Sequence, residues 1–177
     1  MVNWALIVTL SRIALVPVFA FVMFLPIPKK EWLAAAVFCV AASTDCLDGY
    51  LARKHNQITK LGILLDPLAD KLLVITALVF LIGKGVPKWM AWVLIAREFA
   101  VIGLRLIAPK SPISPSFIGK AKTALEMVGI VLIILKFWLG TYILFFAVFF
   151  SIVSGIEYYV AARKWFRWRV QLGIKQR

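Results

Sequence analysis

This sequence predicts an all-α integral membrane protein with six transmembrane helices in a single domain, residues 1–177. Hydrophobic residues make up 63% of the chain, and its mean hydropathy is +0.93. Charged residues make up 16%, against about 25% in soluble domains. A spanning helix needs about 20 mostly apolar residues, so six such helices with short connections account for nearly the whole chain.

Six apolar segments follow one another, and prolines and tryptophans mark their ends. Pro26, Pro28 and Pro87 stand between segments, where a helix is readily interrupted. Trp32 and Trp89 lie near segment ends, and indole rings favour the membrane surface. The expected segments are Leu6–Leu25, Trp32–Ala52, Gly62–Gly83, Trp89–Ile107, Ile118–Trp138 and Thr141–Ala162.

The basic residues predict which side of the membrane each connection faces. Cytoplasmic loops carry the excess of Lys and Arg, so we expect the larger group and both termini at the cytoplasmic face of a bacterial-type cytoplasmic membrane. The larger group is Arg53, Lys54, Lys60, Lys110, Lys120, Lys122, Arg163, Lys164, Arg167, Arg169, Lys175 and Arg177; the smaller is Lys29, Lys30, Lys84, Lys88 and Lys136. The net charge of +13 is then explained by membrane lipids and phosphorylated substrates, and no nucleic-acid partner is expected.

Four aspartates occur toward the cytoplasmic ends of the second and third segments. Asp45 and Asp48 are three residues apart, and Asp66 and Asp70 are four apart, so each pair shares one helix face. A carboxylate at membrane depth costs roughly 2.5–3.5 kcal/mol on insertion scales, so four of them need compensation. Carboxylates suit Mg²⁺ or Mn²⁺, and a pair of such ions about 3.5–4 Å apart is typical of phosphoryl transfer. We therefore expect these residues to bind two divalent cations.

Small and basic residues follow Asp48 on the same expected helix. Gly49 leaves room for a flat group against the helix backbone, and Ala52 keeps the same groove open. Arg53 can form two hydrogen bonds to a phosphate. The alternative is that Gly49 and Ala52 only allow neighbouring helices to pack closely.

At these residues the chain resembles the CDP-alcohol phosphatidyltransferases. Their signature is D-x-x-D-G-x-x-A-R, eight residues, then G-x-x-x-D-x-x-x-D, and every fixed position is met between Asp45 and Asp70. The resemblance implies the six-helix bundle of that family, with cytoplasmic termini and pairing as a homodimer. It also implies transfer of a phosphatidyl group from CDP-diacylglycerol to an alcohol, with release of CMP.

The resemblance also implies a role for each motif residue. Asp70 would act as the general base on the acceptor hydroxyl. The residues that would bind the CDP moiety are Asp48, Gly49, Ala52 and Arg53. The metal ligands would be Asp45, Asp48, Asp66 and Asp70.

Basic residues in the fourth and fifth segments indicate the acceptor alcohol. Arg97 and Arg105 are eight residues apart and share a helix face, and Lys120 and Lys122 open the next segment. We expect these four to form a cationic pocket beside the metal ions, which an acceptor bearing a phosphate needs and a neutral one does not. The surrounding stretches also resemble the branch of the family whose acceptor is glycerol 3-phosphate.

Other interpretations stay open. Inositol 1-phosphate is a rival acceptor that would use the same cations. Lys120 and Lys122 can instead contact anionic membrane lipids, and Glu98 can simply pair with Arg97 or Arg105. A divalent-cation transporter is a more distant alternative, opposed by the position of all four aspartates near one side of the membrane.

Overall fold

The computed structural model describes the backbone of residues 4–55, 60–107 and 117–171. Side chains are described for residues 10–44, 68, 71–103, 119–160, 163 and 167. Within the described backbone the chain forms six α-helices. They are α1 (Trp4–Phe24), α2 (Lys30–His55), α3 (Lys60–Leu81), α4 (Lys88–Ile107), α5 (Phe117–Ile134) and α6 (Leu139–Gln171).

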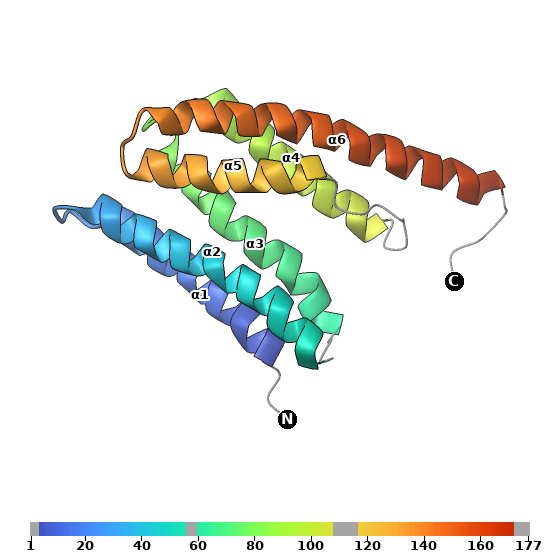
Figure 1. Ribbon diagram of the computed structural model, residues 1–177, viewed down its shortest axis with the longest axis horizontal. Helices are drawn as coiled ribbons and strands as arrows, with labels where there is room; N and C mark the ends of the chain where they lie inside the picture. The colour runs from blue at the N-terminus through green and yellow to red at the C-terminus, as the bar shows by residue number, and fades with distance from the viewer. Residues whose placement is uncertain (1–3, 56–59, 108–116, 172–177) are drawn as a thin grey trace.

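The helices run back and forth, so the connections fall at two ends of the molecule. The α1–α2 and α5–α6 turns lie at one end, on the left of Figure 1, whereas α2 ends and α3 begins at the other. Helix α1 packs against α2 and α3, and α5 packs along α6. Helix α3 contacts α2, α4 and α5 and therefore joins the two groups.

An apolar interior holds the first five helices together. Phe19, Phe38, Leu78, Leu94 and Ile130 come from five different helices, and none is more than 1% exposed. The rings of Phe19 and Phe38 lie 5.9 Å apart, centroid to centroid. Because lipid tails are as apolar as these side chains, close packing, and not removal from water, favours the association of helices inside a membrane.

Helices α5 and α6 approach each other at two glycines. A Cβ on Gly140 would lie 2.8 Å from the backbone nitrogen of Ile133, and one on Gly129 would lie 3.1 Å from that of Leu144. A larger residue at Gly140 would force the two backbones apart, because the nearest atoms include main chain. Small residues at a helix contact are typical of membrane bundles.

Helix α5 ends earlier than the sequence indicates. Its last residue is Ile134, whereas the sequence predicts an apolar segment that runs to Trp138. The backbone N–H of Lys136 donates to the carbonyl of Ile133 at 2.9 Å, and that of Phe137 donates to Leu132 at 2.8 Å. Lys136 has a φ of 64°, so it occupies the left-handed position of a Schellman motif, where glycine is usual. The amino-acid type of Lys136 does not indicate that the helix ends here.

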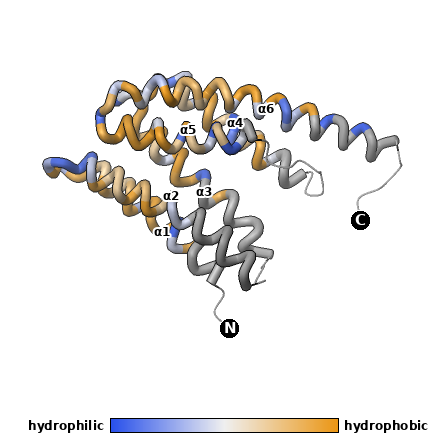
Figure 2. The backbone as a smooth tube through the Cα atoms, viewed as in Figure 1, coloured by the Kyte–Doolittle hydropathy of each residue, from blue (hydrophilic) through white to orange (hydrophobic). Residues whose placement is uncertain are grey.

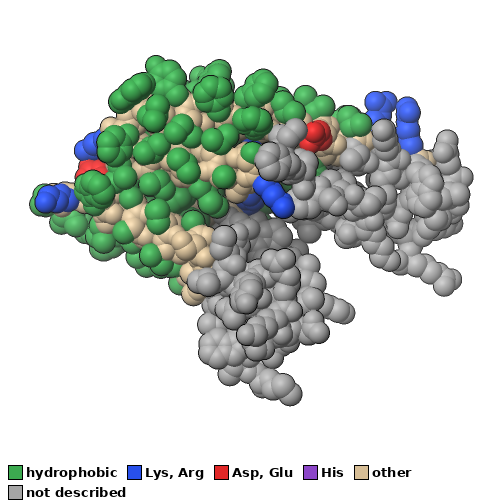
Figure 3. Space-filling model, viewed as in Figure 1, with side chains coloured by type: hydrophobic (Ala, Val, Ile, Leu, Met, Phe, Trp, Pro, Cys, Tyr) green, Lys and Arg blue, Asp and Glu red, His purple; other side chains and the backbone are tan. Residues whose placement is uncertain are grey.

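The outer face of α6 is apolar and exposed. Tyr142, Phe145, Phe149 and Ile156 are each about half exposed or more, and hydrophobic side chains cover most of the described surface in Figure 3. Figure 2 shows the same apolar run along α5 and α6. Among the described residues, Leu139–Val160 is the one segment long and apolar enough to cross a membrane, with 22 residues and a mean hydropathy of 2.1, and only 33% of its most apolar stretch is buried. The all-α, six-helix prediction is confirmed for the described backbone, with one helix clearly capable of spanning a membrane.

Candidate active site

The four aspartates lie on adjoining helices at one end of the bundle. Asp45 and Asp48 belong to the second half of α2, and Asp66 and Asp70 to the first half of α3. These two helices run in opposite directions and contact each other. The side chains of all four, and those of Gly49, Ala52 and Arg53, lie outside the described residues. That the four carboxylates meet in one site therefore stays a prediction, with which the backbone placement agrees.

A buried carboxylate lies beside this region. Glu98 on α4 is 1% exposed, and three cations surround it. Its Oε2 is 3.0 Å from the amine of Lys71, the residue that follows Asp70 on α3. Its Oε1 is 3.0 Å from Nη1 of Arg97 and also pairs with the amine of Lys122 on α5, which is fully buried. One carboxylate thus connects α3, α4 and α5 near the aspartates.

A second acid completes this group, which we call the buried ion cluster. Glu126 lies one turn beyond Lys122 on α5, and its Oε2 is 2.6 Å from the lysine amine. The cluster contains three cations, Lys71, Arg97 and Lys122, and two carboxylates. Its net charge is therefore +1 when every group is ionised. Buried charge is unfavourable unless it is paired, so the cluster favours an additional anion.

The guanidinium of Arg97 is held in a fixed orientation. Nη1 donates to Glu98, and Nη2 donates to the hydroxyl of Ser154 on α6 at 2.7 Å. The Ser154 hydroxyl in turn donates to the carbonyl of Ser151 at 3.2 Å. The buried Nε of Arg97 has no hydrogen-bond partner among the described residues. This leaves an oriented N–H available to a ligand, and guanidinium donors suit phosphate oxygens.

The structure brings together part of the expected cationic pocket. Arg97 and Lys122 meet through Glu98. Lys120 is exposed and takes no part in the cluster, and the side chain of Arg105 lies outside the described residues. Glu98 does pair with Arg97, as the alternative interpretation predicts, but the same carboxylate also binds Lys71 and Lys122.

Sequence reasoning did not identify the three-cation role of Glu98 or the hydrogen bond from Arg97 to Ser154. One signal was available. Glu98 and Glu126 are acids within apolar segments, and each needs compensation there. Which cations supply it depends on how three helices pack, and the pattern along one chain does not contain that information.

Comparison with known proteins agrees with the resemblance seen in the sequence. The family described as CDP-alcohol phosphatidyltransferase matches residues 2–153. A Bacillus subtilis (strain 168) protein is 39% identical over 175 residues, covering 86% of this chain and 91% of its own. An Escherichia coli (strain K12) protein is 37% identical over 173 residues, covering 91% and 95%. Both relatives are named CDP-diacylglycerol–glycerol-3-phosphate 3-phosphatidyltransferase. The expected family is thereby confirmed.

Proposed function

Since this chain belongs to the CDP-alcohol phosphatidyltransferase family, we propose that it transfers the phosphatidyl group of CDP-diacylglycerol to glycerol 3-phosphate, giving phosphatidylglycerophosphate and CMP. The relatives in Bacillus subtilis and Escherichia coli carry this donor and this acceptor in their names. The observation that carries the choice of acceptor is the buried ion cluster beside Asp70, with the unpartnered Nε of Arg97.

The charge of the acceptor explains why such a cluster is needed. A phosphate monoester carries about −1.5 to −2 at neutral pH, as phosphorylated side chains do. Placing it near four aspartates is repulsive unless local cations compensate. Lys122 supplies that charge from a fully buried position, and Arg97 from one that is 14% exposed, where electrostatic interactions are stronger than in water. Arg105 and the exposed Lys120 are proposed to add to the same pocket.

The donor set of the proposed metal site suits hard divalent cations. Asp45, Asp48, Asp66 and Asp70 offer only carboxylate oxygens, which Mg²⁺ and Mn²⁺ accept and which zinc and copper do not select. These four residues would hold two such ions, which would neutralise the diphosphate of the donor and stabilise the CMP leaving group.

The chain's own residues would perform the remaining steps. Arg53 would pair with a donor phosphate, with Gly49 and Ala52 leaving room for the nucleotide. Asp70 would accept the proton of the glycerol 3-phosphate hydroxyl. The hydroxyl oxygen would then bond to the phosphatidyl phosphorus while the bond from that phosphorus to the bridging oxygen breaks, and CMP would leave with the electron pair. Arg97, oriented by Glu98 and Ser154, would hold the acceptor phosphate during this exchange.

The proposed setting is a membrane. All six helices would span it, with the active site and both termini in the cytoplasm, and two chains would form a homodimer. The alternating helix directions and the exposed apolar face of α6 support this arrangement. A site at the membrane surface would admit a lipid donor from the bilayer and a soluble acceptor from water.

Product identification tests the proposal. The purified protein would receive CDP-diacylglycerol, Mg²⁺ and one acceptor at a time: glycerol 3-phosphate, inositol 1-phosphate or serine. We expect CMP release and phosphatidylglycerophosphate with the first acceptor. Preference for inositol 1-phosphate would contradict the proposed acceptor, whereas the proposed reaction class would still hold. Preference for serine would contradict the role of the buried ion cluster.

A further inference from the structure

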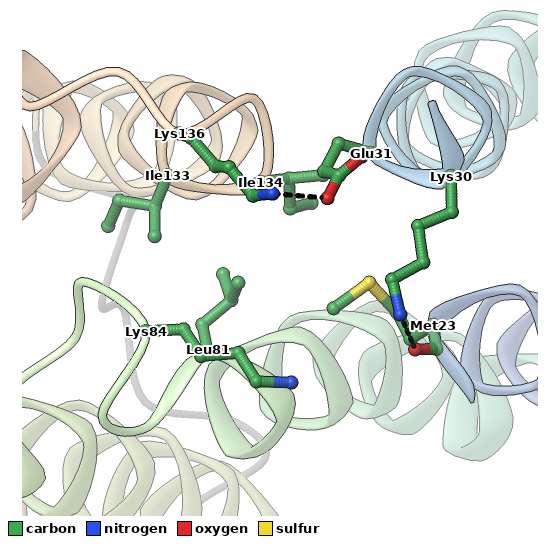
Figure 4. A pocket seen from close by; sticks show the side chains of 8 residues that line it. All are labelled: Met23, Lys30, Glu31, Leu81, Lys84, Ile133, Ile134 and Lys136. Carbon is green, nitrogen blue, oxygen red and sulfur yellow. Dashed lines mark hydrogen bonds and ion pairs between the residues drawn. The ribbon is translucent and has the colours of Figure 1, made fainter. Parts of the chain in front are cut away.

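A cavity of about 230 Å³ opens at the end of the bundle opposite the aspartates. Figure 4 shows its walls: Lys30 and Glu31 begin α2, Lys84 follows α3, and Lys136 follows α5. Apolar side chains, including Leu81 and Ile133, form the rest. Lys30 and Asp48 are 18 residues apart on α2, so the cavity lies about 27 Å from the aspartate end of that helix.

The charged lining of this cavity is unbalanced. The amine of Lys136 is 2.6 Å from Oε1 of Glu31, and that of Lys30 donates to the carbonyl of Met23 at the end of α1, at 3.3 Å (Figure 4). The side-chain amine of Lys84 makes no hydrogen bond or ion pair to any described residue, whereas its backbone N–H donates to the carbonyl of Leu81 at 2.9 Å. Three cations therefore face one carboxylate, and one amine has its donors free. This composition favours an anion.

The cavity is formed by a fixed framework. Lys136 adopts the left-handed backbone conformation, unfavourable for a lysine, in the Schellman motif at the end of α5. The turn after α3 is also constrained. A Cβ on Gly85 would lie 2.8 Å from a methyl carbon of Ile133, and the carbonyl of Gly85 accepts a 2.8 Å hydrogen bond from the Thr141 hydroxyl on α6. The two turns that carry Lys84 and Lys136 are thus held against each other.

We propose that this cavity binds the phosphate of an anionic membrane lipid. The three amines and one carboxylate give the lining a net charge of +2, which attracts the negative charge of a phosphate, and the apolar walls match the glycerol and the beginning of the acyl chains. Ligand pockets for drug-sized molecules are about 300–1,000 Å³, so this cavity accommodates a headgroup and not a whole lipid. Phe137 and Trp138, directly after Lys136, are 51% and 74% exposed, as aromatic residues are at a membrane surface. This site is separate from the proposed active site.

Lipid-induced stabilisation tests the proposal on the intact chain in a non-ionic detergent. The probes are phosphatidylglycerol, phosphatidylcholine and inorganic phosphate, each titrated while the thermal unfolding midpoint is measured. We expect phosphatidylglycerol to raise the midpoint most. Lys84→Gln should lower the affinity for phosphatidylglycerol about tenfold, which is the effect of losing one hydrogen bond to a charged group. Lys88→Gln is the matched control, because Lys88 is exposed nearby but does not line the cavity.

Two further variants separate binding from folding. Lys136→Gly removes a cation but favours the left-handed turn, so weaker lipid binding without a lower midpoint in lipid-free detergent supports the site. Glu31→Gln removes the only acid among the described residues that line the cavity and should tighten lipid binding, an effect that damage to the fold would not produce. Equal lipid affinity in the wild type, Lys84→Gln and Lys136→Gly would overturn the proposal. If phosphatidylcholine raises the unfolding midpoint as much as phosphatidylglycerol does, the ligand need not be anionic and the proposal fails. If inorganic phosphate raises it as much, the ligand need not be a lipid and the proposal fails.

Discussion

Replacing Glu98 with glutamine removes the carboxylate that joins three helices while almost preserving its volume. In the wild type this carboxylate is 3.0 Å from Lys71 and from Arg97 and also pairs with the buried Lys122. Glu98→Gln leaves those three cations with Glu126 alone. The change therefore raises the net charge of the cluster from +1 to +2 in a site almost closed to water.

The expected loss of stability is large for one substitution. Removing one partner of a buried ion pair costs about 3–5 kcal/mol, because the other charge stays buried without compensation. The pair with Lys122 is the fully buried one, whereas the Lys71 side chain is 23% exposed and can turn to water. For a chain of this length, about 1 kcal/mol corresponds to roughly 2–4 °C in the unfolding midpoint, so we expect a decrease of about 6–20 °C.

Thermal unfolding in detergent measures this decrease, with Glu157→Gln as the control. Glu157 lies on α6 and is exposed, and exposed substitutions usually stay within about 0.5 kcal/mol. Glycerol 3-phosphate should stabilise Glu98→Gln more than the wild type, since the variant has more uncompensated positive charge. If Glu98→Gln and Glu157→Gln unfold at the same temperature, the buried ion cluster does not stabilise the fold as argued.

Three other predictions concern the base, an anchoring hydroxyl and pH. Asp70→Asn should lower turnover about 10²- to 10⁴-fold, and a chelator should abolish activity until Mg²⁺ or Mn²⁺ is restored; full activity in either sample contradicts the mechanism. Ser154→Ala frees Nη2 of Arg97, so it should raise KM for glycerol 3-phosphate about tenfold and leave KM for CDP-diacylglycerol unchanged. The control is Ser151→Ala, which removes a hydroxyl without a hydrogen-bond partner among the described residues and should change neither KM. The hydrogen bond from its lysine partner lowers the pKa of Glu31 from the usual 4.5, so this pair stabilises the fold at neutral pH and stops doing so as the pH falls through the lowered pKa. Glu31→Gln should therefore remove part of the decrease in unfolding midpoint seen below about pH 4.5, and an unchanged pH profile would show that the pair contributes nothing.

The presence of the helices could be predicted from the sequence, and their ends could not. Runs of about 20 apolar residues fix where a helix is needed. Helix α5 ends at Ile134 because Lys136 adopts the left-handed backbone conformation. Lysine has no preference for that conformation, so the sequence does not indicate this helix end. Helix α6 continues to Gln171, beyond the expected end at Ala162, because hydropathy indicates where an apolar segment ends and basic residues remain good helix formers.

The candidate site shows the same division. The aspartate motif is local, so spacing alone placed Asp45, Asp48, Asp66 and Asp70 on two adjoining helices. The cationic pocket depends on tertiary packing, whereas the sequence-based prediction grouped its residues because they lie close together in the chain.

Lys120 and Lys122 illustrate the limit of such grouping. Two residues along a helix differ in direction by about 200°, so one of these lysines is buried in the cluster while the other is exposed. The partners of Glu98 come from three helices, and only the packing of those helices reveals them.

The ratio of kcat/KM for glycerol 3-phosphate to that for glycerol tests the central claim most directly. The two acceptors share the attacking hydroxyl and differ in the phosphate that Arg97 is proposed to hold. We expect a strong preference for glycerol 3-phosphate in the wild type and a ratio about 10- to 150-fold lower in Arg97→Ala, with KM for CDP-diacylglycerol unchanged. An Arg97→Ala enzyme that keeps the wild-type ratio would contradict recognition of the acceptor phosphate by the buried ion cluster.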